Sequence, residues 1–400
     1  MTNENLTPKI RFKGFTDPWE QRKAREIFIS RTEKNHADQP VLSVTQDNGI
    51  VLRKDIDIDI KYDKSTLKNY KLVRPSEFVI SLRSFQGGFE LAEIQGIVSP
   101  AYTIFAFDEA HYYDITFWKY LFKTFSFIES LKKVTYGIRD GKSISFNEFS
   151  SLKLVYPIKK NEQANIGGLL DEIADLIAAN EDKLKHLQEL KKLLMQKIFS
   201  QEWRFKGFTD PWEQRKLNQI VSKSTEKNSK NQFEETLTNS AVYGIVKQND
   251  YFDRKVSGKD TSNYYVVKPD YFVYNPRISV SAPFGPIRKN KLGITGVMSP
   301  LYIVFKLAGE KIKSEFLETF FKSTNWYKFM YQNGDSGARS DRFAIKDKLF
   351  FKMPILIPSV DEQQKIGKII DALSNLIAAN EDKLNQLKQV KKFLMQNMFV

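Results

Sequence analysis

Side chains that commonly carry out catalysis or bind metal ions are few and dispersed in this sequence. The chain contains no Cys, and its three histidines, His36, His111 and His186, lie 75 residues apart. Disulfides, thiolate zinc sites and cysteine nucleophiles are therefore excluded, and no two histidines have the spacing of a metal site. Three aspartates alternate in residues 55–59, which favours the solvated face of a strand over a metal site. We expect neither a catalytic residue nor a metal site in this chain.

Motifs that hold a nucleotide or a target base are also missing. An adenine methyltransferase needs Asn or Asp followed by Pro-Pro and an aromatic residue, and the chain contains neither a Pro-Pro pair nor a G-x-G-x-x-G motif. Residues 137–143 resemble a phosphate-binding loop, but three residues separate the glycines where that loop has four. We interpret this segment as a turn that faces DNA or solvent, with Arg139, Lys142 and Ser143 as candidate DNA contacts.

Three further segments offer side chains suited to DNA. Arg can pair with a guanine edge, and Gln or Asn with an adenine edge, through two hydrogen bonds. Such groups lie in a glycine-rich turn of the first half and in two segments of the second half. Phosphate contacts and solvated loops are the alternatives for each segment. The candidate DNA-binding residues here are Arg83, Ser84, Gln86, Gly87, Gly88, Arg288, Lys289, Asn290, Lys291, Asn333, Arg339 and Arg342.

The charge of the chain is unevenly distributed. The 400 residues carry a formal net charge of +14. Lys and Arg exceed Asp and Glu by 5 in residues 1–160 and by 10 in residues 201–357, whereas residues 161–200 and 358–400 are nearly neutral. We expect double-stranded DNA to contact the two basic regions. The longest uncharged stretch, residues 292–305, is too short to span a membrane, so we expect a cytoplasmic protein.

The chain is a tandem duplication of about 200 residues. Residues 11–23 recur without change as residues 204–216, and residues 176–184 recur as residues 376–384. Thirteen identical residues in a row do not arise by chance. Because the two copies differ in most other positions, we expect two similar domains that read different bases.

Each copy ends in a segment with helical periodicity. Apolar residues recur in heptad series in both copies, and no Pro or Gly interrupts residues 169–199 or 369–399. This pattern predicts a long helix with a coiled-coil seam. Asn180 and Asn380 occupy equivalent seam positions, where we expect a buried polar pair that fixes register, with a partner contact as the alternative. Small residues repeat on the outer face and suggest a docking surface, namely Ala178, Ala179, Ala378 and Ala379.

The remainder of each copy has the β-branched and aromatic composition of a mixed domain. We predict strands at residues 78–82, 102–107, 152–156, 271–274, 302–307 and 349–353. We predict one helix at residues 117–131 and another at residues 314–331. The predicted domain organisation is a globular domain at residues 1–160, a long helix at 161–200, a second globular domain at 201–357 and a second long helix at 358–400.

Connectivity predicts how the two copies are joined. A helix of roughly 36–40 residues is about 55–60 Å long and must carry the chain to the second domain. If the second helix packs along the same seam, it must run back antiparallel, so that residues 11–23 follow its end as residues 204–216 follow the first helix. We therefore predict an α+β fold with two globular domains and an antiparallel coiled coil, in a circular, pseudo-twofold arrangement. Such a molecule would recognise a bipartite, asymmetric DNA target.

These features resemble the specificity subunits of type I restriction–modification systems. Residues 7–23 look like the opening segment of these subunits. Residues 358–366 resemble the Pro followed by Glu-Gln-x-x-Ile at the start of each long helix of the family, and residues 161–166 match less closely. The resemblance covers essentially the whole chain.

The resemblance implies a non-catalytic subunit with two target-recognition domains on a helical pair. It implies that this pair binds two methyltransferase subunits, to which restriction or translocase subunits are added. S-adenosylmethionine, ATP and Mg²⁺ would then belong to those partners, with no cofactor bound by this chain. Two alternatives stay open: a decoy that binds methyltransferase subunits without reading DNA, and an enzyme fused to recognition domains.

Overall fold

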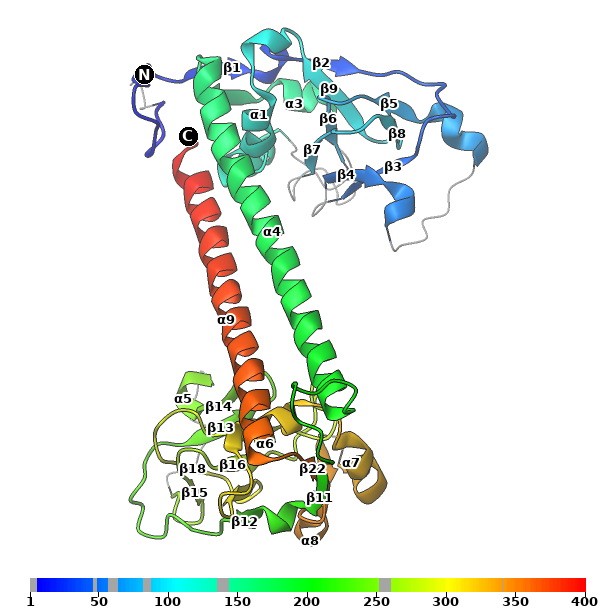
Figure 1. Ribbon diagram of the computed structural model, residues 1–400. Coiled ribbons are helices and arrows are strands. Elements are labelled where there is room, and N and C mark those ends of the chain that lie inside the picture. The colour runs from blue at the N-terminus through cyan, green and yellow to red at the C-terminus, as the bar shows by residue number, and fades with distance from the viewer. Residues whose placement is uncertain are drawn as a thin grey trace. The chain divides into compact units, whose positions relative to one another are not determined.

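The computed structural model describes residues 6–45, 49–56, 64–81, 88–134, 144–251, 260–339 and 341–400, with the backbone alone for residues 64 and 336–339. The chain divides into two compact units (Figure 1). Unit 1 comprises residues 1–182 and 382–400, and unit 2 comprises residues 183–381. Both boundaries fall within the long helices, so each unit contains one domain and part of each helix. The C-terminal residues therefore belong to the N-terminal domain, as the predicted circular arrangement requires.

The domain of unit 1 is built on a four-stranded antiparallel sheet. Its strands follow in the order β2 (Phe28–Arg31), β9 (Thr103–Phe107), β6 (Phe78–Ile80) and β7 (Phe89–Leu91). Three antiparallel pairs surround this sheet: β1 (Glu20–Lys23) with β10 (Lys153–Tyr156), β3 (Leu42–Thr45) with β4 (Gly49–Leu52), and β5 (Lys71–Val73) with β8 (Gly96–Val98). Strands β6, β9 and β10 confirm three of the predicted strands.

Three short helices cover one face of this sheet. They are α1 (Ile115–Leu121), α2 (Phe125–Leu131) and α3 (Phe146–Ser150). The prediction of a single helix at residues 117–131 is wrong, because α1 ends at Leu121 and a second helix, α2, starts at Phe125. The side chain of Thr124 accepts a hydrogen bond from the backbone N–H of Phe127 and thereby caps the start of α2. A Thr at this position favours a new helix start over continuation.

The domain of unit 2 repeats the same sheet. Its central strands follow in the order β12 (Val221–Lys223), β19 (Ile303–Leu307), β16 (Phe272–Tyr274) and β17 (Ile287–Lys289). The surrounding pairs are β11 (Glu213–Lys216) with β22 (Pro354–Ile357), β13 (Leu237–Ser240) with β14 (Gly244–Lys247), β15 (Tyr265–Val267) with β18 (Gly296–Met298), and β20 (Asp335–Arg339) with β21 (Arg342–Ala344).

The helices of unit 2 correct two sequence-based predictions. They are α5 (Gln248–Tyr251), α6 (Ser314–Lys322), α7 (Tyr327–Asn333) and α8 (Asp347–Phe350). The predicted helix at residues 314–331 is two helices, since Ser323 has extended backbone and ends α6. The predicted strand at residues 349–353 is the end of α8 and a turn, and the strand lies at β22 instead. A short apolar run does not distinguish helix from strand, which explains this error.

Each face of the central sheet has its own hydrophobic core. Along β6, Phe78 and Ile80 contribute to a core rich in aromatic side chains, whereas Val79 contributes to a smaller core on the other face. Successive side chains of a strand point to opposite faces, and β16 alternates in the same way.

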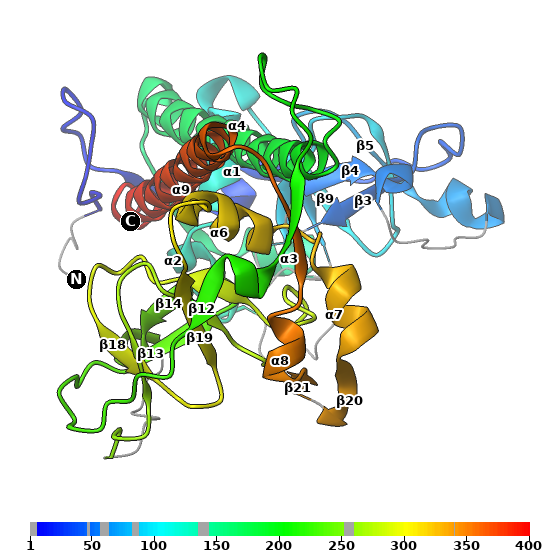
Figure 2. The same ribbon diagram turned by 60° about the horizontal axis from the view of Figure 1, so that its bottom comes forward.

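Figure 2 shows α6 of unit 2 beside the N-terminal end of the second long helix.

The long helices are α4 (Lys160–Phe199) and α9 (Val360–Asn397). In unit 1, Ile166 of α4 packs in the same core as Met398, and Glu181 pairs with Lys388 at 2.7 Å. Residue numbers thus rise along α4 as they fall along α9. In unit 2 the amide of Gln188 donates to Glu381 at 3.3 Å, which continues the same antiparallel register. These contacts confirm the predicted α+β fold with antiparallel helices. No helix in the described ranges is long and apolar enough to cross a membrane.

Candidate nucleic-acid interface

A buried ion pair joins the repeated segment to the start of each long helix. Arg11 donates to both carboxylate oxygens of Glu162, with Nε–Oε1 and Nη2–Oε2 distances of 2.6 and 2.8 Å. Arg204 contacts Glu362 in the same two-pronged way, at 3.0 and 2.7 Å. Both glutamates are almost completely buried, and hydrogen bonding to Glu162 raises the pKa of Arg11. Paired charge-assisted bonds of this kind fix an orientation.

The glutamine that follows each of these glutamates closes the joint. Gln163 accepts from the backbone N–H of Asp114 at 2.9 Å and donates to the carbonyl of Pro157 at 2.8 Å. Gln363 makes the equivalent bonds to the backbone of Lys313 and Pro358. Both amides are fully buried and bonded within the protein. Residues 11–23 and 204–216 therefore serve as structural joints between domain and helix.

The C-terminus occupies the place in unit 1 that the chain between the copies occupies in unit 2. The backbone N–H of Ile10 donates to the carbonyl of Asn397 at 2.9 Å, as Trp203 donates to Lys197 at 3.1 Å. The ring of Phe399 stacks on Phe117 with a centroid distance of 5.3 Å. In Figure 1 the end of α9 lies beside the start of α4. A noncovalent junction thus reproduces a covalent one.

The seam asparagines bond within their own helices. The side-chain amide of Asn180 donates to the carbonyl of Leu176 at 2.6 Å, and that of Asn380 donates to Leu376 at 2.7 Å. Both residues are buried, as predicted for seam positions. Their amide donors are satisfied by the preceding helical turn. This geometry offers no support for a register-fixing pair of the two amides.

Each helix also exposes apolar side chains outside the seam, which the heptad analysis missed. Unit 1 exposes Leu176 of α4 together with Val390 and Phe393 of α9. Each of these residues, and each of their equivalents in unit 2, is 44 to 53% exposed. Unit 2 exposes the equivalent residues, Leu376 of α9 with Leu190 and Leu193 of α4. Glu181 of α4 pairs with Lys388 of α9, and the two helices are antiparallel. Leu176, five residues before Glu181, is therefore level with Phe393, five residues after Lys388. We call these sets the unit 1 patch and the unit 2 patch.

The predicted small residues are exposed on the same helices. Ala178 and Ala179 of α4 and Ala378 and Ala379 of α9 are all exposed. At about 100° per residue, Ala179 lies on the side of α4 that carries Leu176 and Leu190. The signal that could have located this surface is the repetition of apolar residues off the seam at identical positions of both copies.

Most candidate DNA contacts of the first domain lie outside the described residues. These are Arg83, Ser84, Gln86, Gly87, Arg139, Lys142 and Ser143. Gly88 is described and buried, and its carbonyl accepts a hydrogen bond from the backbone N–H of Ser81 at 2.8 Å. Gly88 therefore closes the base of the turn between β6 and β7.

The segment at residues 288–291 is tied into the fold of unit 2. Asn290 is 1% exposed, and its amide donates to the carbonyls of Val267 and Ile294. Lys289 is 8% exposed and contacts Asp270 and Glu315 at 3.2 and 3.3 Å. Although burial lowers the pKa of Lys289, its bonds to these carboxylates raise it overall. Burial and internal pairing argue against base contacts by either residue, contrary to the sequence-based expectation.

The other two members of this segment are also engaged. Arg288 donates from Nη2 to the carbonyl of Ala241 at 2.9 Å and from Nη1 to that of Ile287 at 3.1 Å. Burial lowers the pKa of Arg288. Lys291 pairs with Glu318 at 2.8 Å and with Asp371 of α9 at 3.6 Å. Arg288 supports the backbone of a hairpin, and Lys291 links the domain to the long helix.

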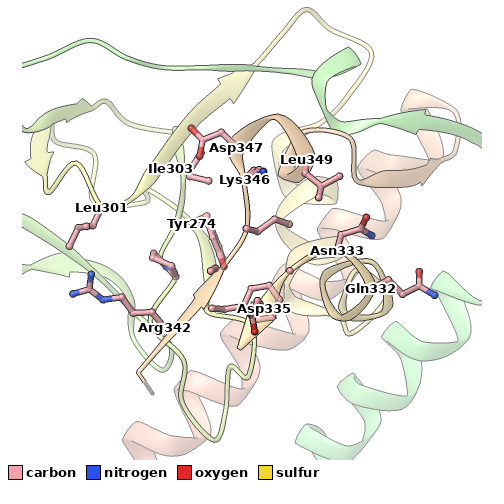
Figure 3. A pocket seen from close by; sticks show the side chains of 15 residues that line it. Tyr274, Leu301, Ile303, Gln332, Asn333, Asp335, Arg342, Lys346, Asp347 and Leu349 are labelled. Carbon is pink, nitrogen blue, oxygen red and sulfur yellow. The ribbon is translucent and has the colours of Figure 1, made fainter. Parts of the chain in front are cut away.

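Two of the remaining candidates, Asn333 and Arg342, line a cavity of about 910 Å³ in unit 2. Figure 3 shows Arg342 and Asn333 on opposite sides of Tyr274. Asn333 donates to the carbonyl of Phe329 at 2.8 Å, and Arg342 is partly exposed beside Asp341. Arg339 pairs with Arg342 across β20 and β21, and its side chain lies outside the described part. The structure brings Asn333 and Arg342 together around one cavity, which both apolar and polar residues line.

Sequence reasoning missed a second exposed feature of unit 2. The turn between β13 and β14 exposes Val242 and Tyr243 by 73% and 71%. The signal was a three-residue loop, Ala-Val-Tyr, followed by Gly244, between two short β-prone runs. In the described part of the chain, no three His, Asp or Glu side chains gather as a metal site would require.

The structure thus combines a doubled α+β domain and antiparallel long helices with an excess of Lys and Arg in both domains. Residues 209–389 match the family model described as the type I restriction modification DNA specificity domain. The second copy therefore contains a domain of this family, and the first copy repeats its sequence motifs, since residues 11–23 and 176–184 recur as residues 204–216 and 376–384. The members of this family are the non-catalytic specificity subunits of their systems and bind no cofactor themselves.

One solved structure supports the fold over nearly the whole chain. The S subunit of a type I restriction–modification system from M. genitalium is 15% identical, covers 99% of both chains and superposes with a TM-score of 0.62. The HsdS subunit from Thermoanaerobacter tengcongensis is 12% identical, covers 97% of this chain and 98% of the other, and has a TM-score of 0.49. No match was found among curated protein sequences.

Proposed function

We propose that this specificity subunit recognises a bipartite DNA target, with residues 1–160 and 201–357 reading one part each. The observation that carries the proposal is that two copies of one fold share the same ion pair at the joint with the long helix but differ in charge and in loop sequence. Lys and Arg are in excess in both domains, which favours contact with DNA phosphates. Different loops on a common fold would read different bases and make the target asymmetric.

The helices at residues 161–200 and 358–400 would set the spacing of the two parts. Helix α4 has 40 residues and is therefore about 60 Å long. One turn of B-DNA rises about 34–36 Å, so the domains would contact the duplex more than one turn apart. The unread base pairs between the two parts would then be fixed in number.

We further propose that each apolar patch binds one methyltransferase subunit. The unit 1 and unit 2 patches contain equivalent residues, and paired exposed apolar patches commonly mark protein interfaces. The exposed alanines beside them would allow close approach of a partner helix. Restriction or translocase subunits would join this assembly through the methyltransferases. S-adenosylmethionine, ATP and Mg²⁺ would be bound by those partners.

The test is to map methylated adenines in cells that carry this chain with its methyltransferase. The expected result is one asymmetric motif with two constant parts and a constant gap. The purified complex should bind that duplex with a strong salt dependence, losing affinity steeply between 50 and 200 mM salt. A decoy would bind the methyltransferase without producing any methylated motif, and that result would refute the proposal.

A further inference from the structure

The β13–β14 hairpin of unit 2 presents two large side chains to solvent. Val242 and Tyr243 are 73% and 71% exposed, and they are consecutive at the tip of the turn. The ring of Tyr243 lies 6.1 Å from that of Tyr251 in α5, in an edge-on arrangement. Such side chains gain nothing in folding from this position, because folding leaves them in water.

The turn that carries them is held in one conformation. Its strands pair up to Ser240 and Gly244, which leaves three residues in the loop, and Gly244 has a φ of +74°. A three-residue loop that ends in a left-handed glycine is a standard hairpin geometry. The hydroxyl of Ser240 accepts from the backbone N–H groups of Val242 and Tyr243, both at 3.3 Å. The guanidinium of Arg288 also supports the turn, because it donates a hydrogen bond to the carbonyl of Ala241.

Buried amides anchor the same hairpin to the central sheet. The side chain of Asn239 donates to the carbonyls of Val273 and Pro286 at 2.8 and 3.1 Å. The side chain of Asn275 donates back to the carbonyl of Asn239 at 2.9 Å. Asn239 is 2% exposed, and its two amide donors and its backbone carbonyl tie the hairpin to the neighbouring strands. A hairpin so anchored can transmit force to whatever its tip contacts.

We propose that Val242 and Tyr243 form a wedge that enters the DNA of the second half of the target and unstacks or contacts a base step. This inference rests on the proposed function and adds the contact residues of one domain. A narrow hairpin fits a DNA groove, and apolar side chains at such tips contact thymine methyl groups or insert between base pairs. The excess of ten positive charges in residues 201–357 favours a nucleic acid over an apolar protein surface.

The first domain carries a different sequence at this place. Its strands β3 and β4 pair up to Thr45 and Gly49, which are equivalent to Ser240 and Gly244. The three residues between them are Gln46, Asp47 and Asn48, which are polar and include a negative charge. The wedge is therefore a property of the second domain. The second half of the target should contain an easily unstacked pyrimidine–purine step or a thymine, with no such requirement in the first half.

The experiment compares Tyr243→Ala and Tyr243→Phe in the full chain with its methyltransferase subunits, on the duplex that methylation mapping identifies. Stacking of one base on an aromatic ring corresponds to a change in affinity of about 5- to 150-fold, so Tyr243→Ala should lose that much. Tyr243→Phe keeps the ring and should keep the affinity. A 2-aminopurine placed at each step of the second half should brighten where the unaltered complex unstacks it, and Tyr243→Ala should abolish that signal.

The outcomes separate this inference from the function on which it rests. If the unaltered complex selects no duplex, the proposed function fails. If it selects its target and Tyr243→Ala binds with unchanged affinity and fluorescence, the wedge alone is refuted. Loss of methyltransferase from the Tyr243→Ala complex, with DNA binding by the remaining chain unchanged, would make the tip a protein contact and would also overturn the inference. A Ser240→Ala variant, which loosens the turn while keeping Tyr243, should weaken binding less than Tyr243→Ala.

Discussion

The two copies are alike where each domain meets its long helix and differ in the loops between equivalent strands. Arg11–Glu162 and Arg204–Glu362 form the same two-pronged pair, and Gln163 and Gln363 make equivalent bonds beside them. The loops between equivalent strands instead change from Gln-Asp-Asn to Ala-Val-Tyr. Features that hold a domain on a helix are constrained by packing on all sides, whereas features that face solvent are constrained only by what they bind. The differences between copies therefore point to the DNA-reading surface.

The largest expected effect tests the likeness of the two apolar patches. Leu176→Glu and Leu376→Glu each place a charge in the centre of one proposed interface. Each should remove one methyltransferase subunit, with a loss of about 4 kcal/mol of binding free energy, typical of a central contact. The double variant should bind none. The molar mass of the complex, measured by light scattering, reports the number of subunits.

Lys185 provides a matched control on α4 for this comparison. It is exposed and lies about 180° around the helix from Leu176, so Lys185→Glu changes charge without entering the patch. This variant should bind two methyltransferase subunits. If Leu176→Glu lost one subunit and Leu376→Glu lost none, the patches would differ in function despite their equivalent positions.

A smaller effect is expected where the two joints differ. The indole N–H of Trp19 donates to Glu162 at 3.3 Å, whereas that of Trp212 is buried with no hydrogen-bond partner among the described residues. Arg204→Ala would leave Glu362 buried and unpaired, at a cost of about 3 kcal/mol in the free energy of unfolding. Arg11→Ala should cost about 1 kcal/mol less, because Glu162 keeps the indole donor. Urea denaturation of the full chain measures both.

Exposed ion pairs of the neighbouring strands serve as controls for the joints. Arg22 pairs with Glu20 and Arg215 with Glu213, each within 2.7 Å, and these pairs are largely exposed. Their replacement by Ala should change stability by at most about 1 kcal/mol. Equal destabilisation by Arg11→Ala and Arg204→Ala would show that the indole of Trp19 does not compensate for the lost guanidinium.

Much of the fold could be predicted from sequence because its signals are periodic or repeated. The heptads of α4 and α9 gave the antiparallel helices, and the identity of residues 11–23 with 204–216 gave the circular connection. Short elements were harder to predict. The aromatic run after Phe117 favours one continuous helix, and only the cap at Thr124 shows that a second helix starts there. The strand placed at residues 349–353 failed because a short apolar run is compatible with either a helix or a strand.

The candidate site was less predictable, because the type of a side chain does not reveal its burial. Asn290 has the chemistry of a base reader, yet the sheet encloses it and uses its amide as an internal crosslink. Arg288 is similarly used by the backbone of a hairpin. Val242 and Tyr243 have the chemistry of core residues, but a turn holds them in water. The partners that enclose Asn290 and Arg288 include Val267 and Ala241, which are more than 20 residues away in sequence, so residue type alone does not reveal these contacts.

The smallest effect concerns a pair of charges that the two copies hold in opposite order. In unit 1, Lys119 of α1 contacts Glu93 and Asp171, each at 3.4 Å. In unit 2 the equivalent of Lys119 is Glu318, and the equivalent of Glu93 is Lys291, which contacts Asp371. Each copy thus links its domain to the long helix through one Lys between two carboxylates. The Lys comes from the helix in one copy and from the loop after the sheet in the other.

Because unit 2 has the opposite order of charges, it serves as a natural reference for a double-mutant cycle at Lys119 and Glu93. Lys119→Glu alone places three carboxylates together and should lower the free energy of unfolding by about 1 kcal/mol, since these side chains are partly exposed. Adding Glu93→Lys recreates the order found in unit 2 and should recover most of that loss, with a coupling of about 0.5–1 kcal/mol by urea denaturation. Burial raises the pKa of Glu318, but Lys322 and Lys291 outweigh it, so the second copy holds its glutamate charged. Strict additivity of the two substitutions would mean that each copy is adapted to its own order of charges, and that the link to the helix depends on more than the pair.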